Sequence, residues 1–428
     1  MKLWDKGYST ESLVEKFTVG NDRILDMDLA KYDVMGNVAH AKMLHKIGIL
    51  NDSELKDLLQ ALNEIQESID NKTFVIEENF EDIHSKIEFE LTKRIGEAGK
   101  KIHTARSRND QILVDLHLYT KDKILLIKQE VNQLFNTLID LSERYSSVLI
   151  PGYTHMQVAM PSSFGLWFSA YAESLVDDLV MLNSAYIIAD QNPLGSGAGY
   201  GSSFPIDRRY TTLLLGFKTL KYNSIATQMS RGKLEKTMAF ALSSLAATLS
   251  KLSSDVILFM NPNFNFLGFP KELTTGSSIM PHKQNPDVFE LLRAKSNKIQ
   301  NLPMEISMII NNLTSGYHRD FQLLKENFML SIENTVENLK VCNFMISKVQ
   351  IKDNILSNKI YDNLYSAEEA NKLVMQGIPF REAYQIIGKK ILSGTFKPDR
   401  RVTHTHEGSI GNLCLKEIRE KFEAQLKG

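Results

Sequence analysis

The chain has 428 residues, and its 50 Lys and Arg residues balance 51 Asp and Glu residues to give a formal net charge of −1 at pH 7. This balance excludes the strong positive field by which a protein holds nucleic acid or an anionic membrane, and the length favours two or three domains. The two cysteines, Cys342 and Cys414, have no paired spacing, which argues against a disulfide framework and against a thiolate zinc site.

The first residues lack the basic and apolar segments of a signal peptide. No uninterrupted apolar run approaches the roughly 20 residues that a membrane helix needs. We therefore expect a cytoplasmic protein with neither nucleic-acid nor membrane partners.

Long helices are predicted because the residues that interrupt helices are scarce: 23 Gly and 11 Pro make up about 8% of the chain, against ~12% in typical soluble proteins. The segment from Lys100 to Ile150 contains neither residue and carries an apolar stripe at alternating steps of three and four. The stripe consists of Ile124, Ile127, Val131, Leu134, Leu138, Leu141 and Tyr145. This spacing is typical of a long helix that packs at a shallow angle in a bundle.

Three more long helices follow. One is predicted from Trp167 through Tyr186, ending before Pro193, and another over roughly 233–260, which again lacks Gly and Pro. The last opens at Asn285, Pro286 and Asp287, which we interpret as a cap, a first-turn proline and an acid that matches the helix dipole.

Strand signals are weak throughout, and the alternating pattern of a parallel-sheet enzyme is missing. The fold class is therefore expected to be all-α. We predict an N-terminal helical domain (1–105), a central domain of long bundled helices (106–355) and a small C-terminal helical domain (356–428). The boundaries follow a polar cluster near residue 105 and the loss of long stripes near residue 355.

Four segments that interrupt the helices carry the chemistry. The loop 275–286 combines Gly276, Ser277, Ser278 and Lys283 ahead of a helix N-terminus, so it could hold a carboxylate or activate a serine. An ordinary Gly-Ser connection with an exposed lysine is the alternative. In segment 101–111, Arg106 and Arg108 offer planar donors suited to carboxylates, and a solvated helix start is the alternative.

The other two segments are also open to more than one interpretation. In segment 152–157, His155 could act as an acid or base near neutrality, although a loop histidine is often only a surface residue. The glycine-rich segment 193–203 follows a helix rather than a strand and has no Gly-Lys-Ser/Thr ending, so nucleotide-loop interpretations fail. A substrate loop or a plain turn remains.

No metal or cofactor is expected. His404, His406 and Glu407 form the one close histidine pair with an acid, and they lie in a polar stretch near the C-terminus. Neither a His-Glu-x-x-His nor a Cys-x-x-Cys motif accompanies them.

Gly276–Pro286, which reads Gly-Ser-Ser-x-Met-Pro-x-Lys-x-Asn-Pro, resembles the signature of the fumarase/aspartase superfamily. His103–Gln111 is similar to the stretch that marks the argininosuccinate lyase family and its delta-crystallin relatives. Further segments resemble that family in the same order: 152–155, 193–198, 206–208 and 377–383. The resemblance spans most of the chain and favours the functional interpretation of all four segments.

This resemblance implies a mechanism in which argininosuccinate loses a proton beside a carboxylate and then expels arginine, leaving fumarate. Ser277 is then the base, while Lys283 and Asn285 stabilise the developing carbanionic charge. His155, supported by Glu290, serves the leaving group as acid. The other implied substrate contacts are Thr154, Arg108, Asn109, Tyr317, Gln322, Lys325, His84 and Asn37. For His84 a structural role is an equal alternative, because Ile83, Ile87 and Leu91 surround it at helical spacing.

The sequence departs from the family pattern at several positions. Ala105 stands where glycine is usual, Val158 and Met160 replace an arginine and a glutamine, and Tyr200 alters the glycine-rich loop. Asn37 occupies the position of a substrate-contacting serine, and an amide can still donate to a carboxylate.

The resemblance also implies an all-α, three-domain fold whose long helices form the core of a homotetramer, with each active site built from three subunits. The stripe Ile124–Tyr145 is consistent with this, since it looks too long and too apolar for one chain's surface. Two other functions remain as alternatives: a related fumarate-releasing lyase, such as one acting on adenylosuccinate, and a crystallin-type relative without activity.

Overall fold

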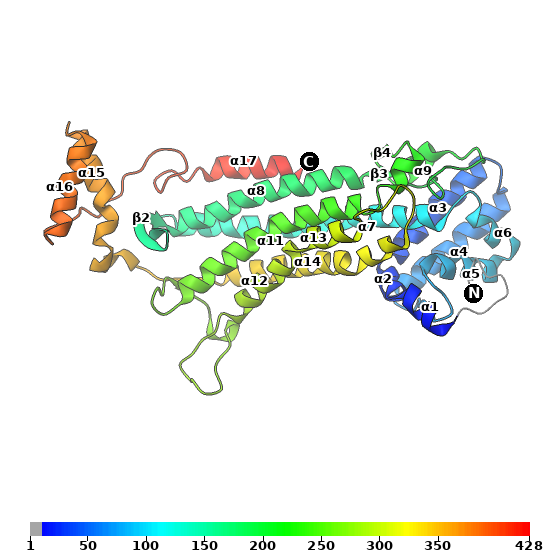
Figure 1. Cartoon of the computed structure of the whole chain (residues 1–428), viewed down its shortest axis with the longest axis horizontal. Helices are drawn as coiled ribbons and strands as arrows, with labels where there is room; N and C mark the ends of the chain where they lie inside the picture. The colour runs from blue at the N-terminus through cyan, green and yellow to red at the C-terminus, as the bar shows by residue number, and fades with distance from the viewer. Residues whose placement is uncertain (1–10) are drawn as a thin grey trace. The chain divides into compact units, whose positions relative to one another are not determined.

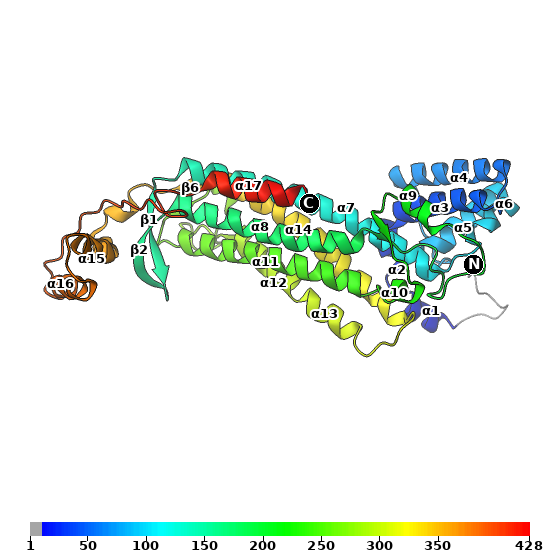
Figure 2. The same ribbon diagram turned by 90° about the horizontal axis from the view of Figure 1, so that it is seen from above.

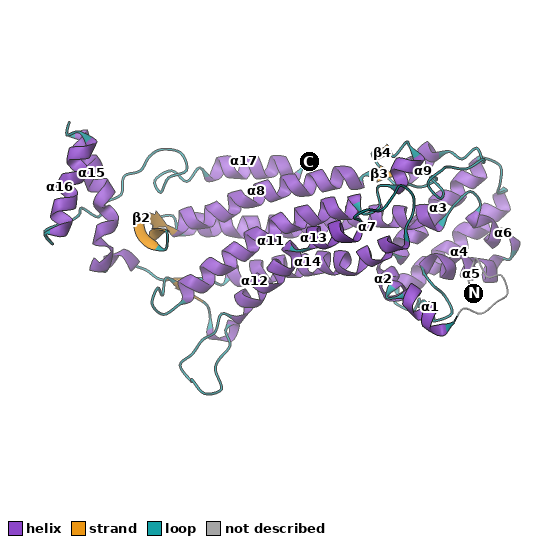
Figure 3. Ribbon diagram, viewed as in Figure 1, coloured by secondary structure: helices purple, strands orange, loops and turns teal. Residues whose placement is uncertain are grey.

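The computed structural model describes residues 11–428, so the N-terminal segment considered above for a signal peptide lies outside the described residues. The prediction of an all-α fold is confirmed: helices dominate the chain and the strands are short (Figure 3). The longer helices are α3 (Ala30–Lys46), α4 (Asp52–Asp70), α5 (Ile83–Ile95), α7 (Arg108–Arg144), α8 (Phe164–Ala189), α11 (Lys233–Met260), α12 (Asp287–Gln300), α14 (Leu324–Ser347), α15 (Ser366–Met375), α16 (Phe380–Leu392) and α17 (Leu415–Leu426).

Shorter elements connect these helices (Figure 1). The short helices are α1 (Ser12–Val19), α2 (Asp22–Leu25), α6 (Glu97–Lys100), α9 (Arg208–Leu214), α10 (Ser224–Gln228) and α13 (Leu302–Ile309). Within residues 11–428 the strands form three two-stranded sheets: β1 (Leu149–Thr154) with β2 (Gln157–Ser163) antiparallel, β3 (Gln191–Asn192) with β4 (Thr219–Leu220) parallel, and β5 (Leu267–Gly268) with β6 (Gln350–Ile351) antiparallel.

The chain divides into two compact units. Of the described residues, the first unit contains 11–126, 181–243 and 299–334, and the second contains 127–180, 244–298 and 335–428. Several long helices have residues in both units, which is why the units do not coincide with consecutive stretches of sequence. The three-domain division stays a prediction.

In the first unit, α3, α4 and α5 enclose an apolar core. Its fully buried members include Leu58, Leu62, Ile83, Ile87 and Leu91. Helix α4 begins at a capping box, in which the Asn51 side chain accepts from the Glu54 N–H and the Glu54 side chain accepts from the Asn51 N–H. Such reciprocal bonds satisfy two of the N–H groups that a helix start leaves free.

In the second unit, long helices run side by side (Figures 1 and 2). Trp167 and Tyr171 of α8 both donate to Asp255 Oδ2 of α11, at 3.0 and 2.6 Å. The C-terminal helix α17 packs on α7, where the rings of Phe422 and Phe135 stack with centroids 3.6 Å apart. These contacts combine apolar burial with satisfied polar groups.

The four predicted long helices are α7, α8, α11 and α12, and their existence is confirmed. The predicted cap of α12 is wrong. The Asn285 side chain turns back to Thr275 Oγ1 and the Gly276 carbonyl, at 3.3 and 3.1 Å. Instead, the Pro286 carbonyl accepts the first helical N–H groups, from Phe289 and Glu290.

The apolar stripe of α7 is buried within the chain itself: Ile127, Val131 and Leu138 are each 0% exposed. The interpretation that this stripe is too apolar for one chain and needs a partner subunit is therefore wrong. Heptad spacing indicates a contact between helices, but it does not say whether the second helix belongs to the same chain.

Helix α11 is the one helix in the described part of the chain with the length and mean hydropathy, 1.2 over 18 residues, to cross a membrane. The core helix of a soluble protein passes the same test, so this is weak evidence. Leu242, Leu245 and Leu249 of α11 are indeed buried in the chain's own core.

Candidate active site

The loop that contains Ser277 is fastened at its base. The Asn285 N–H donates to the Thr275 carbonyl at 2.8 Å, and these two residues form an isolated β-bridge. Between them the chain bulges outward, as the loop before α12 in Figure 1 shows. The bridge therefore fixes where the loop begins and ends.

Within this loop, Ser277 Oγ accepts the backbone N–H groups of Ile279 and Met280, at 3.4 and 3.2 Å. Two N–H groups aimed at one oxygen stabilise negative charge on it. Ser277 is half-buried, while the Lys283 ammonium is exposed and has no hydrogen-bond or ion-pair partner among the described residues. The loop therefore combines a hydroxyl in a favourable electrostatic setting with an unpaired cation.

His155 lies on a β-hairpin, which the sequence did not predict. Thr154 pairs with Gln157, so His155 and Met156 are the two turn residues. Both have left-handed backbone conformations, with φ of 53° and 58°. Two successive positive φ values define a type I′ turn, for which Asn-Gly is the usual signal. The pair His-Met gave no such signal.

The turn is also strained, because a left-handed conformation costs a non-glycine residue ~1–2 kcal/mol. Strain of this kind is concentrated at functional sites. The His155 and Thr154 side chains are exposed in the single chain.

Arg108 and Asn109 open α7 in the first unit. The Arg108 guanidinium pairs with Glu81 Oε2 at 2.8 Å and Asp82 Oδ2 at 3.1 Å, and it donates to Ser85 Oγ at 2.7 Å. The Asn109 side chain is half-buried and has no hydrogen-bond partner among the described residues. Its amide is therefore free to bind a ligand, whereas Arg108 is held in position by α5 and the residues just before it.

Ala105 precedes these residues, and its backbone conformation explains why glycine is usual at this position. Its φ is 64°, in the left-handed region that glycine enters without cost. The departure from glycine therefore preserves the backbone conformation at an energetic cost.

The glycine-rich segment 193–203 supports α7 rather than a nucleotide. Asp110 Oδ2 accepts the N–H groups of Gly195 and Gly197, at 2.9 and 3.0 Å, and Asp110 Oδ1 accepts the Ser107 N–H at 2.8 Å. Gly195 and Gly197 have φ values of 86° and 60°, which only glycine adopts readily. Asp110 therefore ties the arginine segment to the glycine-rich loop.

We expect Asp110→Asn to destabilise the protein by about 2–4 kcal/mol, because an amide nitrogen cannot accept the N–H groups that Asp110 now receives. Urea unfolding of parent and variant at equal protein concentration measures this difference. Asp57→Asn, at an exposed aspartate of α4, is the matched control and should change little. Equal stability of the two variants would contradict the role given to Asp110.

His84 is buried, with 5% of its surface exposed. Its Nδ1 lies 2.7 Å from Asp33 Oδ1 and 3.8 Å from Asp115 Oδ2. Burial alone lowers the pKa of His84, but Asp33, Asp115 and Asp82 outweigh it and raise the pKa to about 9. His84 is therefore an imidazolium at neutral pH.

Asn37 belongs to the same cluster. Its amide donates to the Asp33 carbonyl at 2.8 Å and to Asp33 Oδ2 at 2.9 Å, and its Oδ1 accepts from Arg106 at 2.7 Å. The amide is thus fully engaged, so direct contact with a substrate would require Asn37 to exchange these partners.

Asp33, His84 and Asp115 form the one group of potential metal ligands found in residues 11–428, with their ligand atoms within 4.8 Å of one another. Sequence reasoning missed Asp33, Asp110 and Asp115. For Asp115 a signal existed, because an aspartate inside the apolar run Val114–Leu116 is buried at a cost that needs a reason.

Gln322 and Lys325 hold the N-terminal helices. Gln322 donates to the Thr18 and Val19 carbonyls, at 3.0 and 2.9 Å, and Lys325 Nζ lies 2.6 Å from carboxylate oxygens of both Asp22 and Asp26. Burial lowers the pKa of Lys325, but the two acids outweigh it and raise the pKa.

Tyr317, just before these residues, has a 38% exposed side chain and makes no hydrogen bond to any residue that the structure describes. It is therefore free to bind, whereas Gln322 and Lys325 would first have to release their partners.

The predicted site residues fall into two sets. The first unit contains His84, Asn37, Arg108, Asn109, Tyr317, Gln322 and Lys325, and the second contains Thr154, His155, Ser277, Lys283, Asn285 and Glu290. In the described part of the chain, neither a hydrogen bond nor an ion pair joins His155 to Glu290 or to Ser277.

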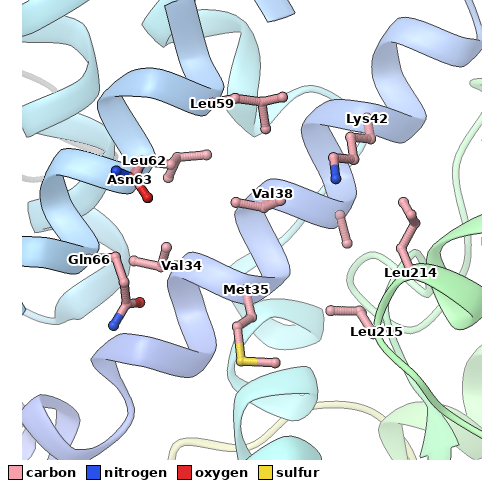
Figure 4. Close-up of a pocket in the computed structure, with 11 residues that line it drawn as sticks. Val34, Met35, Val38, Lys42, Leu59, Leu62, Asn63, Gln66, Leu214 and Leu215 are labelled. Carbon is pink, nitrogen blue, oxygen red and sulfur yellow. The ribbon is translucent and has the colours of Figure 1, made fainter. Parts of the chain in front are cut away.

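A pocket of about 390 Å³ lies elsewhere in the first unit (Figure 4). It is mainly apolar and is lined by residues of α3 and α4 together with Leu214 and Leu215. None of the predicted site residues lines it, so it is not the candidate site.

Comparison with known proteins gives matches over the whole chain. A family model described as Lyase matches residues 6–301. The argininosuccinate lyase of Bacteroides fragilis strain YCH46 is 52% identical over 427 residues, covering 100% of this chain and 96% of the relative. That of Parabacteroides distasonis is 54% identical over 417 residues, covering 97% and 94%.

Solved structures share the fold at lower identity. EDDS lyase in complex with formate has a TM-score of 0.78 at 20% identity, covering 98% of this chain and 91% of that chain. Fumarate lyase:delta crystallin from Brucella melitensis bound to cobalt has a TM-score of 0.72 at 16% identity, covering 98% and 93%. These likenesses support the fold alone.

Proposed function

Because this chain belongs to the argininosuccinate lyase family, within the lyases whose family model it matches, we propose that it cleaves argininosuccinate to arginine and fumarate. The observation that carries the proposal is the 52–54% identity to argininosuccinate lyases over nearly the whole chain. The Ser277 loop, with two N–H groups on the serine oxygen and an unpaired lysine, supports it chemically.

The reaction begins with removal of a weakly acidic proton from the carbon beside a carboxylate. Ser277 is the proposed base in its alkoxide form, after its hydroxyl has released its own proton to solvent; the Ile279 and Met280 N–H groups would stabilise the charged oxygen. Lys283 and Asn285 stabilise the charge that develops on the substrate carboxylate. The exposed loop must cover the substrate for these groups to act together.

The leaving arginine needs a proton on its guanidino nitrogen. His155 is the proposed acid, directly or through a water molecule, and Glu290 near the start of α12 is its proposed partner. The left-handed turn presents the imidazole at the tip of the hairpin.

In the proposed pairing, Glu290 supplies a negative charge that favours the protonated acid, and Glu290→Gln removes that charge. We therefore expect the alkaline limb of the kcat/KM profile of this variant to lie at lower pH than that of the parent. Measuring fumarate release across the pH range checks this. A profile that superimposes on the parent's would leave the pairing without support.

The remaining site residues are proposed to bind the substrate carboxylates. Arg108, Asn109 and Thr154 offer donors from two separate places in the chain. Tyr317, Gln322 and Lys325 are proposed at the arginine-side carboxylate. Binding there by Gln322 and Lys325 would release α1 and η1 (Asp26–Asp28) from their contacts. His84 completes these proposed contacts, and Asn37 lies beside it in the site, bonded to Asp33.

We propose a homotetramer whose sites are shared between subunits. Large apolar side chains are exposed on the long helices of the single chain, among them Ile187 (64%), Leu291 (63%) and Phe344 (51%). Exposed apolar faces of this kind mark interfaces between proteins. The assembly is proposed to work in the cytoplasm, without metal or cofactor.

The decisive experiment incubates the purified protein with argininosuccinate and follows fumarate by its ultraviolet absorbance and arginine by chromatography. Equimolar release of both products supports the proposal. Release from adenylosuccinate instead would assign a different substrate, and inactivity towards both would favour a non-enzymatic relative.

A further inference from the structure

His84 has two ring nitrogens in different surroundings. Nδ1 is bonded to Asp33 Oδ1 at 2.7 Å, whereas Nε2 has no hydrogen-bond partner in the part of the chain that the structure describes. In an imidazolium both nitrogens carry a proton, so Nε2–H is a charged donor left for solvent or a ligand. The question is what keeps this ring charged and correctly oriented.

Asp33 is anchored on both of its oxygens. Oδ1 faces His84, and Oδ2 accepts from the Asn37 amide at 2.9 Å. Asn37 is in turn fixed by Arg106, which donates to its Oδ1 at 2.7 Å. This chain of contacts leaves the Asp33 carboxylate one orientation and leaves the imidazole one tautomer if it loses its proton.

We propose that Asp33, held in place by Asn37, keeps His84 as an imidazolium whose Nε2–H donates to a carboxylate of the substrate. Asp33 and Asn37 are then positioning residues that act through His84 and do not touch the substrate. The inference rests on the proposed function and gives the Asn37 position a role different from direct contact.

The acids around His84 come from several elements. Asp33 lies on α3, Asp115 on α7 and Asp82 at the N-cap of α5, and all three raise the pKa of His84. Asp26 acts on the cluster through Asp115. Burial and Asp33 raise the pKa of Asp115 well above its usual range, and no hydrogen-bond donor reaches either Asp115 oxygen in the described part of the chain. Asp33, whose two oxygens contact the His84 ring and the Asn37 amide, is therefore the acid that is hydrogen-bonded to the ring.

A second histidine, His103, lies near this cluster, just before α7. Burial, Arg106 and Arg108 lower the pKa of His103 to about 4, so this second histidine is neutral at physiological pH. Glu88, 3.5 Å from His103, is half-buried and its pKa is raised mainly by burial. His84 is thus the one charged imidazole of the described cluster.

A proton fits this cluster better than a metal ion. The 2.7 Å separation of His84 Nδ1 and Asp33 Oδ1 is a hydrogen-bond distance, so one proton already lies between the two ligand atoms. The Arg106 guanidinium also supplies a positive charge to the same acids.

The first test reads the protonation of His84 without using activity. In the intact enzyme labelled with ¹³C at histidine Cε1, the resonance that disappears in His84→Gln identifies this ring. We expect that resonance to titrate near pH 9. A His84 resonance that titrates near the ordinary value of about 6.5 would overturn the inference, even if the protein proves to be an active lyase.

The second test is Asp33→Asn, which removes the charge that favours the imidazolium. At about pH 8.5 the variant should have a neutral His84, and losing one charged hydrogen bond should raise KM by about tenfold or more, with a smaller change in kcat. At about pH 6.5 the ring regains its proton, so the increase in KM should shrink. An equal defect at both pH values would indicate a merely structural role and would overturn the inference.

The matched control is Asp52→Asn. Asp52 also pairs with a histidine, His45, at 2.8 Å, but its side chain is 99% exposed and belongs to no proposed site. Its variant should keep the parental KM at both pH values.

Asn37→Ala should change KM in the same direction as Asp33→Asn, but by a smaller factor. An Asn37→Ala protein with the parental KM would remove the positioning role from Asn37.

Discussion

Ser277→Ala is expected to fold normally and to lose about 10²- to 10⁴-fold in kcat, the range that general acid–base catalysis contributes. The physical reason lies in the loop: Ser277 Oγ receives the Ile279 and Met280 N–H groups, and alanine leaves no oxygen to accept a proton. Single-turnover measurement of fumarate release gives the rate of the chemical step directly.

Ser278→Ala is the matched control for this prediction. Ser278 is the next residue of the same exposed loop, and no hydrogen bond from its side chain is found in residues 11–428. Its removal should therefore change the rate far less. If both substitutions had similar, mild effects on the rate, the base would have to be a residue other than Ser277.

The second large effect concerns shared sites. His155→Asn and Ser277→Ala proteins should each be inactive alone, and they should recover activity when unfolded together and reassembled in equal amounts. In the proposed tetramer, a complete site would take its histidine from the serine variant and its serine from the histidine variant. Random mixing provides this in roughly one quarter of sites, so we expect about a quarter of parental activity.

The control for this experiment is each variant refolded by itself, which should stay inactive. The mixed assemblies must be verified, for example by mass spectrometry of the intact oligomer. Verified mixed tetramers without activity would show that both residues come from the same subunit.

Much of the fold could be predicted from local pattern. Helix α11 coincides with the predicted Gly- and Pro-free segment, and α7 contains the predicted apolar stripe. Both could be predicted because helix periodicity depends on residues that are close together in sequence. The hairpin β1–β2 could not be predicted, since its turn uses His155 and Met156 in conformations that neither residue favours. The cap of α12 failed because Asn285 is held by Thr275, a contact ten residues away.

The residues of the candidate site also differ in whether local sequence patterns could identify them. Motifs could point to Ser277, Lys283 and Arg108, because their chemistry is carried by residues close together in sequence. Asp33 and Asp115 could not be assigned to His84, because only the packing of α3 and α7 against α5 brings them to the ring. The same holds for Asp110, whose glycine partners lie more than 80 residues further along the chain.

The His155–Met156 turn sets a limit on how far this enzyme could be made more heat-resistant. Met156 is 64% exposed and left-handed, so glycine would suit its backbone better by ~1 kcal/mol. The adjacent position offers no such freedom if the imidazole is needed for turnover. Substitution at Met156 could therefore stabilise the turn, whereas His155 must keep its strained left-handed backbone for as long as the protein remains a catalyst.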